Sequence, residues 1–149
     1  MAGTFTQIYI HIVFSVKGRR RLLQKPWRFE VFKYMAGIIT EKKQKPIIIY
    51  GVEDHIHILV GLKPNMCISD LVREIKNNSS KFINQQNFVV GKFAWQEGYG
   101  AFSCGHTSIK NVYDYIAGQE EHHRNKTFQE EYLNLLKEHN IDFDEKYLF

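Results

Sequence analysis

Two histidines, His55 and His57, open a segment whose other members up to Val60 are branched apolar residues. This composition predicts a strand in the middle of a sheet. Successive side chains of a strand point to opposite faces, so the two imidazoles would share one face, about 7 Å apart. Two imidazoles that face a common point make half of a divalent metal site. A histidine pair on a solvated strand would have no such role, and the apolar neighbours favour the metal site.

A second pair of residues, Tyr115 and Gln119, is spaced for one face of a helix. Residues four apart on a helix are neighbours, with Cβ atoms about 5–6 Å apart. The tyrosine hydroxyl is a candidate nucleophile and the amide oxygen a candidate metal ligand, although the pair alone is better explained by a buried tyrosine beside a surface amide. His122 and His123 follow closely, and either could replace Gln119 as a third ligand. The relation to Tyr115 favours the glutamine.

Two other residues, Tyr113 and His11, are expected to be part of the core. Tyr113 is two residues from Tyr115 and would lie on a different face of the helix, so we expect it in the core. His11 lies in the middle of a predicted strand, where we expect a hydrogen-bonded core histidine rather than a ligand.

Charge is distributed unevenly along the chain, although the net charge is only +4. Residues 17–45 hold ten basic and two acidic residues, residues 46–119 balance at six against six, and residues 120–149 hold eight acids and four bases. The densest cluster comprises Lys17, Arg19, Arg20 and Arg21. Four cations in five residues repel one another, and phosphates would relieve that repulsion. The cluster therefore favours a nucleic-acid partner, while the lysines near residue 43 are better explained as the exterior of a helix.

Apolar periodicity predicts the elements that must position these residues. Strands are expected at Thr6–Val16, Ile47–Tyr50, His55–Val60 and within Phe93–Cys104, and helices at Trp27–Lys43, Ser69–Asn84, from Thr107 or Ser108 to about His123, and from Thr127 to about His139. The order β-α-β-β-α-β-α-α is typical of an α+β fold with helices packed on an antiparallel sheet.

Length and composition exclude several classes of protein. A chain of 149 residues with 44% hydrophobic residues is expected to form a single domain over residues 1–149 and to bury a core. Two cysteines, Cys67 and Cys104, are too few for a disulfide scaffold or a cysteine-rich zinc module. No apolar run reaches the roughly 18–20 residues that span a membrane, and no secretory signal is recognisable. We therefore expect a cytoplasmic protein with no membrane association.

Taken together, these motifs resemble those of a known family, the single-tyrosine HUH transposases. His55-Ile56-His57 fits the HUH motif, in which two histidines flank a hydrophobic residue, and Tyr115-x-x-x-Gln119 fits the helix that carries the nucleophile. Lys17-Gly18-Arg19 after the first strand and the region Trp95–Phe102 extend the resemblance over most of the chain. The family comprises the TnpA-type enzymes of bacterial insertion sequences, with relatives associated with repetitive extragenic palindromes.

The resemblance implies a fold, a reaction and a set of site residues. The fold would be ferredoxin-like, similar to RNA-recognition modules, with His55 and His57 on a central strand beneath the helix of Tyr115 and Gln119. The histidines and Gln119 would bind Mg²⁺ or Mn²⁺, and Tyr115 would cut single-stranded DNA beside imperfect hairpins. Cleavage would leave a 5′-phosphotyrosine and a free 3′-hydroxyl that later rejoins strands. The family also implies a homodimer.

The residue types suit that chemistry, and two other functions remain open. A tyrosine with a pKa near 10 is protonated at neutral pH and needs a cation at the phosphate to help it attack. Two imidazoles favour later transition metals, so we expect Mn²⁺ or Zn²⁺ to bind tightly in vitro. The alternatives are a relaxase or replication-initiator nuclease with the same chemistry, and a non-catalytic nucleic-acid-binding module.

Overall fold

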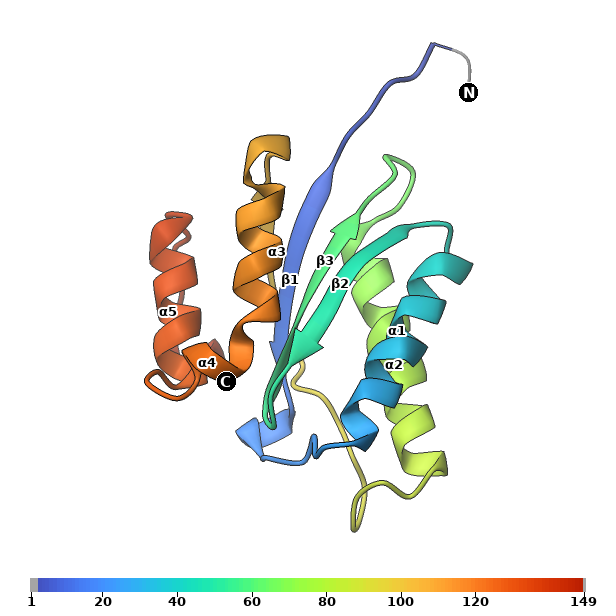
Figure 1. Cartoon of the computed structure of the whole chain (residues 1–149), viewed down its shortest axis with the longest axis vertical. Helices are drawn as coiled ribbons and strands as arrows, with labels where there is room; N and C mark the ends of the chain where they lie inside the picture. Colours follow the sequence, from blue (N-terminus) through green and yellow to red (C-terminus); the bar gives the residue numbers. More distant parts are fainter. Residues whose placement is uncertain (1–2, 149) are drawn as a thin grey trace.

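Four antiparallel strands form one sheet in the order β2-β3-β1-β4, and Figure 1 shows helices on both of its faces. The computed structural model describes residues 3–148. The strands are β1 (Tyr9–Ser15), β2 (Lys45–Gly51), β3 (His55–Gly61) and β4 (Gly100–Cys104). The α-helices are α1 (Trp27–Glu41), α2 (Ile68–Gln85), α3 (Ile109–Ala117), α4 (Gln119–His122) and α5 (Phe128–Glu138). Short 3₁₀ helices lie at η1 (Lys17–Arg19), η2 (His106–Ser108) and η3 (Glu145–Tyr147). The predicted α+β fold with an antiparallel sheet is confirmed.

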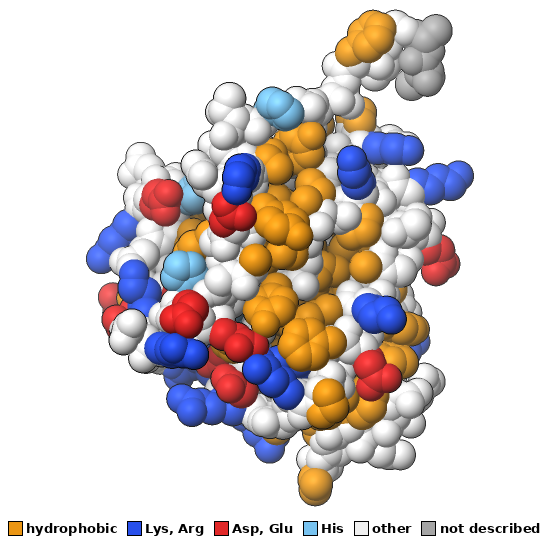
Figure 2. Space-filling view, in the orientation of Figure 1, with side chains coloured by type: hydrophobic (Ala, Val, Ile, Leu, Met, Phe, Trp, Pro, Cys, Tyr) orange, Lys and Arg blue, Asp and Glu red, His pale blue; other side chains and the backbone are white. Residues whose placement is uncertain are grey.

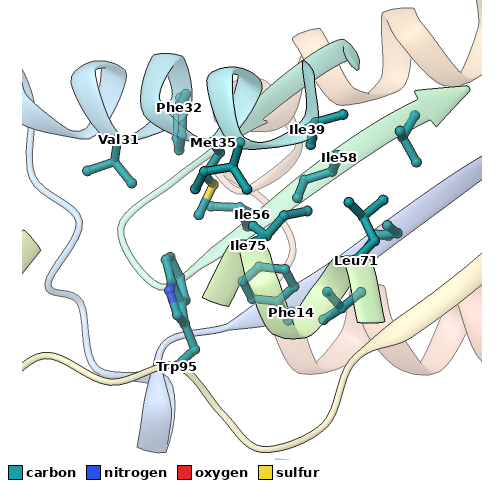
Figure 3. Close-up of a cluster of buried hydrophobic side chains, with 14 of the residues drawn as sticks. Phe14, Val31, Phe32, Met35, Ile39, Ile56, Ile58, Leu71, Ile75 and Trp95 are labelled. Atoms are coloured by element: carbon teal, nitrogen blue, oxygen red, sulfur yellow. The ribbon is translucent and has the colours of Figure 1, made fainter. Parts of the chain in front are cut away.

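Alternation along β1 and β3 divides the interior into two layers. Because both strands lie in the middle of the sheet, both of their faces are covered, and both read as nearly continuous buried runs. One face contributes Ile12, Phe14, Ile56 and Ile58 to the larger core, where they meet α1 and α2 (Figure 3). The opposite face carries the histidines and lies under α3, α4 and α5 (Figure 1).

The second, smaller core holds α5 on the histidine-bearing face. Its buried members are Val13, Phe102, Phe128, Tyr132, Leu135, Leu136 and Leu148. The helix begins with a capping box, in which the Thr127 side chain accepts from the Glu130 amide and Glu130 reaches back to the amide of Thr127. The sequence therefore predicted the start of α5 correctly, and the apolar spacing of its residues explains why it docks on the sheet.

Several predicted boundaries differ from the structure. The first strand begins at Tyr9 rather than Thr6, and only Gly100–Cys104 of the fourth segment joins the ladder. The predicted helix to His123 breaks at Gly118, which ends α3 and precedes α4. Glycine favours such breaks because it loses more backbone freedom in a helix than other residues.

The edge strand β2 leaves apolar side chains partly exposed. Its residues from Pro46 to Tyr50 are half-buried, and Figure 2 shows hydrophobic side chains gathered along the middle of this face. Tyr113 on α3 is 41% exposed, so its predicted place in the core is wrong. Pro46 lies beside a register shift at this edge, where a strand tolerates the missing N–H.

The composition gave expectations about the cysteines and about membrane-spanning helices. Cys67 and Cys104 are both free thiols. Within residues 3–148, no helix combines the length and the apolar character needed to cross a bilayer.

Replacing Gly100 is expected to disturb α5, because a Cβ at this position would lie 2.7 Å from Cε1 of the buried Tyr132. Gly100→Ala should lower the free energy of unfolding by about 1–3 kcal/mol, as overpacking typically does. Thermal unfolding and amide exchange in α5 measure the effect. Gly98→Ala is the control, since an added Cβ there meets no described atom within 4 Å. Equal effects of the two variants would contradict this account of α5 docking.

Candidate active site

His55 and His57 lie side by side on β3, fully buried beneath the helices of the second layer. Their ring centroids are 5.2 Å apart, and the rings are nearly perpendicular. The strand alternation expected from the sequence is therefore present, and both side chains lie on one face. Burial of two imidazoles requires polar partners, and these come from three other elements.

A single carboxylate, that of Glu131 on α5, occupies the centre of the site. Its Oε1 lies 3.1 Å from Nε2 of His55, 3.1 Å from Nε2 of His57 and 3.0 Å from Nε2 of His123. Its Oε2 accepts hydrogen bonds from the Tyr115 hydroxyl and, at 3.0 Å, from Nε2 of Gln119. Glu131 is only 2% exposed, and its two oxygens connect the imidazoles of His55, His57 and His123 to the candidate nucleophile.

Gln119 and Tyr115 lie near the histidine pair, an arrangement that the family resemblance implied. Gln119 is fully buried, and its Oε1 lies 3.1 Å from Nε2 of His55 and 3.1 Å from Nε2 of His123. The Tyr115 ring lies 5.8 Å from the His57 ring, centroid to centroid. Of the two alternative ligands, His123 lies in the cluster, whereas the exposed His122 stacks on Tyr115 at 4.7 Å.

The start of α4 is held in place by the neighbour of Gln119. Oε1 of Glu120 accepts hydrogen bonds from the Tyr50 hydroxyl at 2.8 Å and from Nη2 of Arg28 at 3.3 Å, and it lies 3.0 Å from Nζ of Lys25. These partners come from β2 and from the region around the start of α1. These contacts of Glu120 hold the start of α4, and with it Gln119, against β2 and the start of α1.

Each histidine of the pair has a separate partner for its second ring nitrogen. Nδ1 of His55 lies 2.7 Å from Oδ1 of Asp54, and Nδ1 of His57 lies 2.8 Å from Nε2 of His11. His11 is thus the hydrogen-bonded core histidine that the sequence predicted. Partners of this kind orient the rings and select the tautomer that leaves Nε2 available to a metal.

The protonation of the cluster follows from burial and from these contacts. Burial opposes charge on His55, but hydrogen bonds to Asp54 and Glu131 outweigh it and raise the pKa of His55 to about 9. Burial and the neighbouring His57 lower the pKa of His11 to about 3, so His11 is neutral. Burial lowers the pKa of His57 as well.

The carboxylate and the tyrosine have pKa values shifted in opposite directions. Burial opposes ionisation of Glu131, but hydrogen bonds from His123, His55 and His57 prevail and hold its pKa far below the usual range. Burial and the charge of Glu131 raise the pKa of the Tyr115 hydroxyl well above its ordinary value. In the resting arrangement, therefore, the ionised carboxylate of Glu131 accepts a hydrogen bond from the protonated Tyr115 hydroxyl.

The donor atoms fit a divalent cation. His55, His57 and Glu131 offer ligand atoms that all lie within 4.8 Å of one another, and all three side chains are buried. Imidazole nitrogens suit transition metals, and carboxylate and amide oxygens suit Mg²⁺ and Mn²⁺. A set with both kinds of ligand is compatible with Mn²⁺ in particular. A cation would have to displace the proton of His55, because metal ligands bind deprotonated.

Sequence reasoning missed Glu131, although a signal was present. Phe128, Glu131, Tyr132 and Leu135 share the apolar spacing of one helix face, and all four are buried. A charged residue on a buried face requires a polar partner elsewhere in the fold. The acidic character of the C-terminal segment obscured this one carboxylate.

The basic cluster lies at the end of β1, with one member beside the site. Lys17, Arg20 and Arg21 are exposed and Arg19 is half-buried, in and directly after η1. Arg21 lines a cavity of about 500 Å³ together with Asp54 and His123. The structure thus brings Arg21 close to the histidine cluster.

This combination of fold and site defines a class of protein. A βαββαβ sheet that carries a histidine pair on a central strand, covered by a helix with a tyrosine, is the HUH fold of single-tyrosine transposases. The chain belongs to the IS200-like transposase family, whose family model, "Transposase IS200 like", matches residues 4–119. The match ends at Gln119, so His123 and Glu131 lie outside it.

Related sequences and structures agree with this family. The transposases for insertion sequence element IS200 of Salmonella typhimurium LT2 and Salmonella typhi are each 29% identical over 127 residues, which cover 81% of this chain and 82% of the relative. A putative transposase from Deinococcus radiodurans R1 has a TM-score of 0.62 at 19% identity, covering 80% of this chain and 95% of its own. A REP-associated tyrosine transposase bound to a REP hairpin has a TM-score of 0.61 at 14% identity, covering 83% of this chain and 73% of its own. The two structures share the fold.

Replacing Glu131 tests whether its carboxylate is a metal ligand. Glu131→Gln keeps the shape of the side chain and removes its charge. Even partners behind a ligand contribute about 10–100-fold to metal affinity, so we expect Mn²⁺ binding to weaken at least about tenfold. Calorimetry or electron paramagnetic resonance of Mn²⁺ measures the change, and the exposed Glu41→Gln is the control. Tighter binding by Glu131→Gln would instead mean that the carboxylate only blocks the site.

Proposed function

We propose that this transposase cleaves and rejoins single-stranded DNA at hairpin-containing ends through a 5′-phosphotyrosine on Tyr115. One observation carries the proposal: the Tyr115 hydroxyl and the candidate ligands His55, His57 and Gln119 all contact the same buried carboxylate. Nucleophile and ligands therefore lie within one small volume of a single chain. Family membership favours this reading over a relaxase, a replication initiator or a non-catalytic module.

Tyr115 supplies the new bond, and Glu131 orients it. The Tyr115 hydroxyl oxygen attacks the phosphorus and releases its proton to water, while Oε2 of Glu131 holds the hydroxyl through the existing hydrogen bond. The bond from phosphorus to the 3′-oxygen breaks, and that oxygen takes a proton from water to become a 3′-hydroxyl. The phosphotyrosine conserves the phosphodiester energy, so a 3′-hydroxyl can later attack it and release the tyrosine without ATP.

His55, His57 and Gln119, together with Glu131, would hold the Mg²⁺ or Mn²⁺. When bound, the cation would withdraw charge from the phosphate and stabilise the crowded oxygens of the transition state. Asp54 orients His55 through its Nδ1 atom.

His11 has the corresponding role for His57. Because His11 is neutral, its Nε2 can accept a hydrogen bond from the Nδ1–H of His57 and leave Nε2 of that ring free for the ion.

The DNA would run along the basic cluster Lys17, Arg19, Arg20 and Arg21. Arg21 is placed to meet a phosphate near the histidines, since it lines the same cavity as His123. A hairpin substrate is supported by the structural neighbour that is bound to a REP hairpin.

The remaining features of the proposal concern assembly and location. We propose a single domain over residues 1–149 that acts as a homodimer, as the family resemblance implies, in the cytoplasm where the DNA is found. The contacts among Tyr115, Gln119 and the histidine pair form within one chain, which supports a site built from the residues of a single subunit.

Removing the nucleophile tests the proposed reaction. Incubation with single-stranded oligonucleotides carrying hairpins and Mn²⁺ should yield a covalent protein–DNA band on denaturing electrophoresis. Tyr115→Phe should abolish the band because no other group forms the phosphodiester, and a chelator should abolish it in the wild type. Tyr113→Phe, on the exposed side of the same helix, should retain it. An adduct that persists in Tyr115→Phe would refute the assignment.

Removing basic side chains tests the proposed path of the DNA. The double variant Arg20→Ala and Arg21→Ala should bind single-stranded DNA more weakly. The slope of log affinity against log salt should fall by about 0.7 for each lost phosphate contact. Lys33→Ala with Lys81→Ala is the control, because both residues are exposed on helices of the opposite layer. Fluorescence anisotropy at several salt concentrations measures the slopes, and an equal change in both variants would place the DNA elsewhere.

A further inference from the structure

A cavity of about 590 Å³ opens directly onto the candidate nucleophile. It lies between α3 and α5, which stand next to each other on one face of the sheet (Figure 1), and β4 forms its floor. Tyr115, Glu131 and His11 line it at the site described above. Its volume is within the range of about 300–1,000 Å³ that is usual for ligand pockets. A group that enters this cavity would lie next to the Tyr115 hydroxyl.

Part of the lining suits a flat ring. The exposed ring of His139 contributes an aromatic wall, and it is backed by the buried Phe102 on β4, whose ring lies 4.6 Å away at an angle of 30°. Val112 on α3 and Leu135 on α5 add apolar surface from the two helices. Aromatic walls of this kind stack on nucleobases, and stacking contributes in a way that tolerates many sequences.

Two amides face the cavity from opposite helices. Asn111 comes from α3 and Asn134 from α5. Both side chains are exposed, and neither forms a hydrogen bond to another residue of the described range 3–148. An amide offers two donors and an acceptor, which match the polar edge of a base. The pair thus provides the recognition that a stacking wall lacks.

Charge decides which part of a nucleotide would enter. Glu131 and Glu138 line the cavity, and two carboxylates would repel a phosphate. Lys126 lines this cavity and also the smaller one on the other side of Tyr115. A phosphate would therefore stay near Lys126 and the tyrosine, while an uncharged base would fit inside.

We propose that the cavity binds the unpaired base of a nucleotide that flanks the scissile phosphate, and that Asn111 and Asn134 select that base. The inference rests on the proposed function, because only DNA attacked by Tyr115 places a base there. Asn111 lies on α3 within the residues that match the family model, and Asn134 lies on α5 outside them, so the pair joins the matched region to the C-terminal segment.

The test reads the bases on both sides of the cut. Wild-type protein is incubated with Mn²⁺ and single-stranded oligonucleotides of random sequence. The strands attached to the protein and the released strands are then sequenced. We expect a preference for one base at one position adjacent to the cut. Asn111→Ala with Asn134→Ala should reduce that preference about tenfold, since one well-placed amide contact contributes about 1–3 kcal/mol of discrimination. Preferences at other positions should persist.

Asn65→Ala is the matched control, an exposed asparagine before α2 that should leave the profile unchanged. A second measurement needs no cleavage: Tyr115→Phe should bind the selected strand about tenfold more tightly than the same strand without that base, because stacking contributes about 1–3 kcal/mol per base.

The outcomes separate the two proposals. An unchanged profile in the double asparagine variant, or a uniform loss of preference at all positions, would overturn the base subsite and leave the reaction intact. A wild type that forms no adduct on any strand would overturn the proposed reaction, and the subsite with it.

Discussion

The buried carboxylate of Glu131 is the contact on which the site depends. Three imidazole nitrogens lie 3.0–3.1 Å from one of its oxygens, and the other oxygen accepts from Tyr115 and Gln119. An ionised carboxylate is expensive to bury unless such partners surround it. The same contacts that make Glu131 tolerable therefore hold the nucleophile against the candidate metal ligands. Every element that bears one of these groups must be docked for the others to be satisfied.

The sheet provides the rigid half of this arrangement. β3 and β1 lie in the middle of the sheet and pack on both faces, so His57 and His11 have little freedom. Their side chains meet diagonally across two antiparallel strands, and the resulting hydrogen bond sets the tautomer of the metal-facing ring. The helical half depends on packing by the smaller core. The proposed base selection belongs to the cavity between α3 and α5, which is lined by the exposed Asn111 and Asn134.

Much of the site could be predicted because its signals are local. The period of two along β3 placed His55 and His57 on one face, and the spacing of four residues placed Tyr115 beside Gln119. Where the reasoning failed, the missing information was not local. Tyr113 was expected in the core, but its face of α3 is exposed. The contact of Glu131 with the histidine pair was missed because the pair is distant in sequence, His55 by 76 residues and His57 by 74.

The sequence by itself determined the order of strands and helices along the chain, the strands that are buried on both faces and the separate pairs of chemically active residues. These features follow from backbone periodicity and turn residues. Only the tertiary structure decided that the pairs meet. It places α5 beside α3 on the histidine-bearing face of the sheet (Figure 1), inserts Glu131 among the imidazoles and leaves a cavity beside Tyr115. The physical reason is that a buried charge is positioned by the free energy of its whole surroundings, which no short stretch of residues contains.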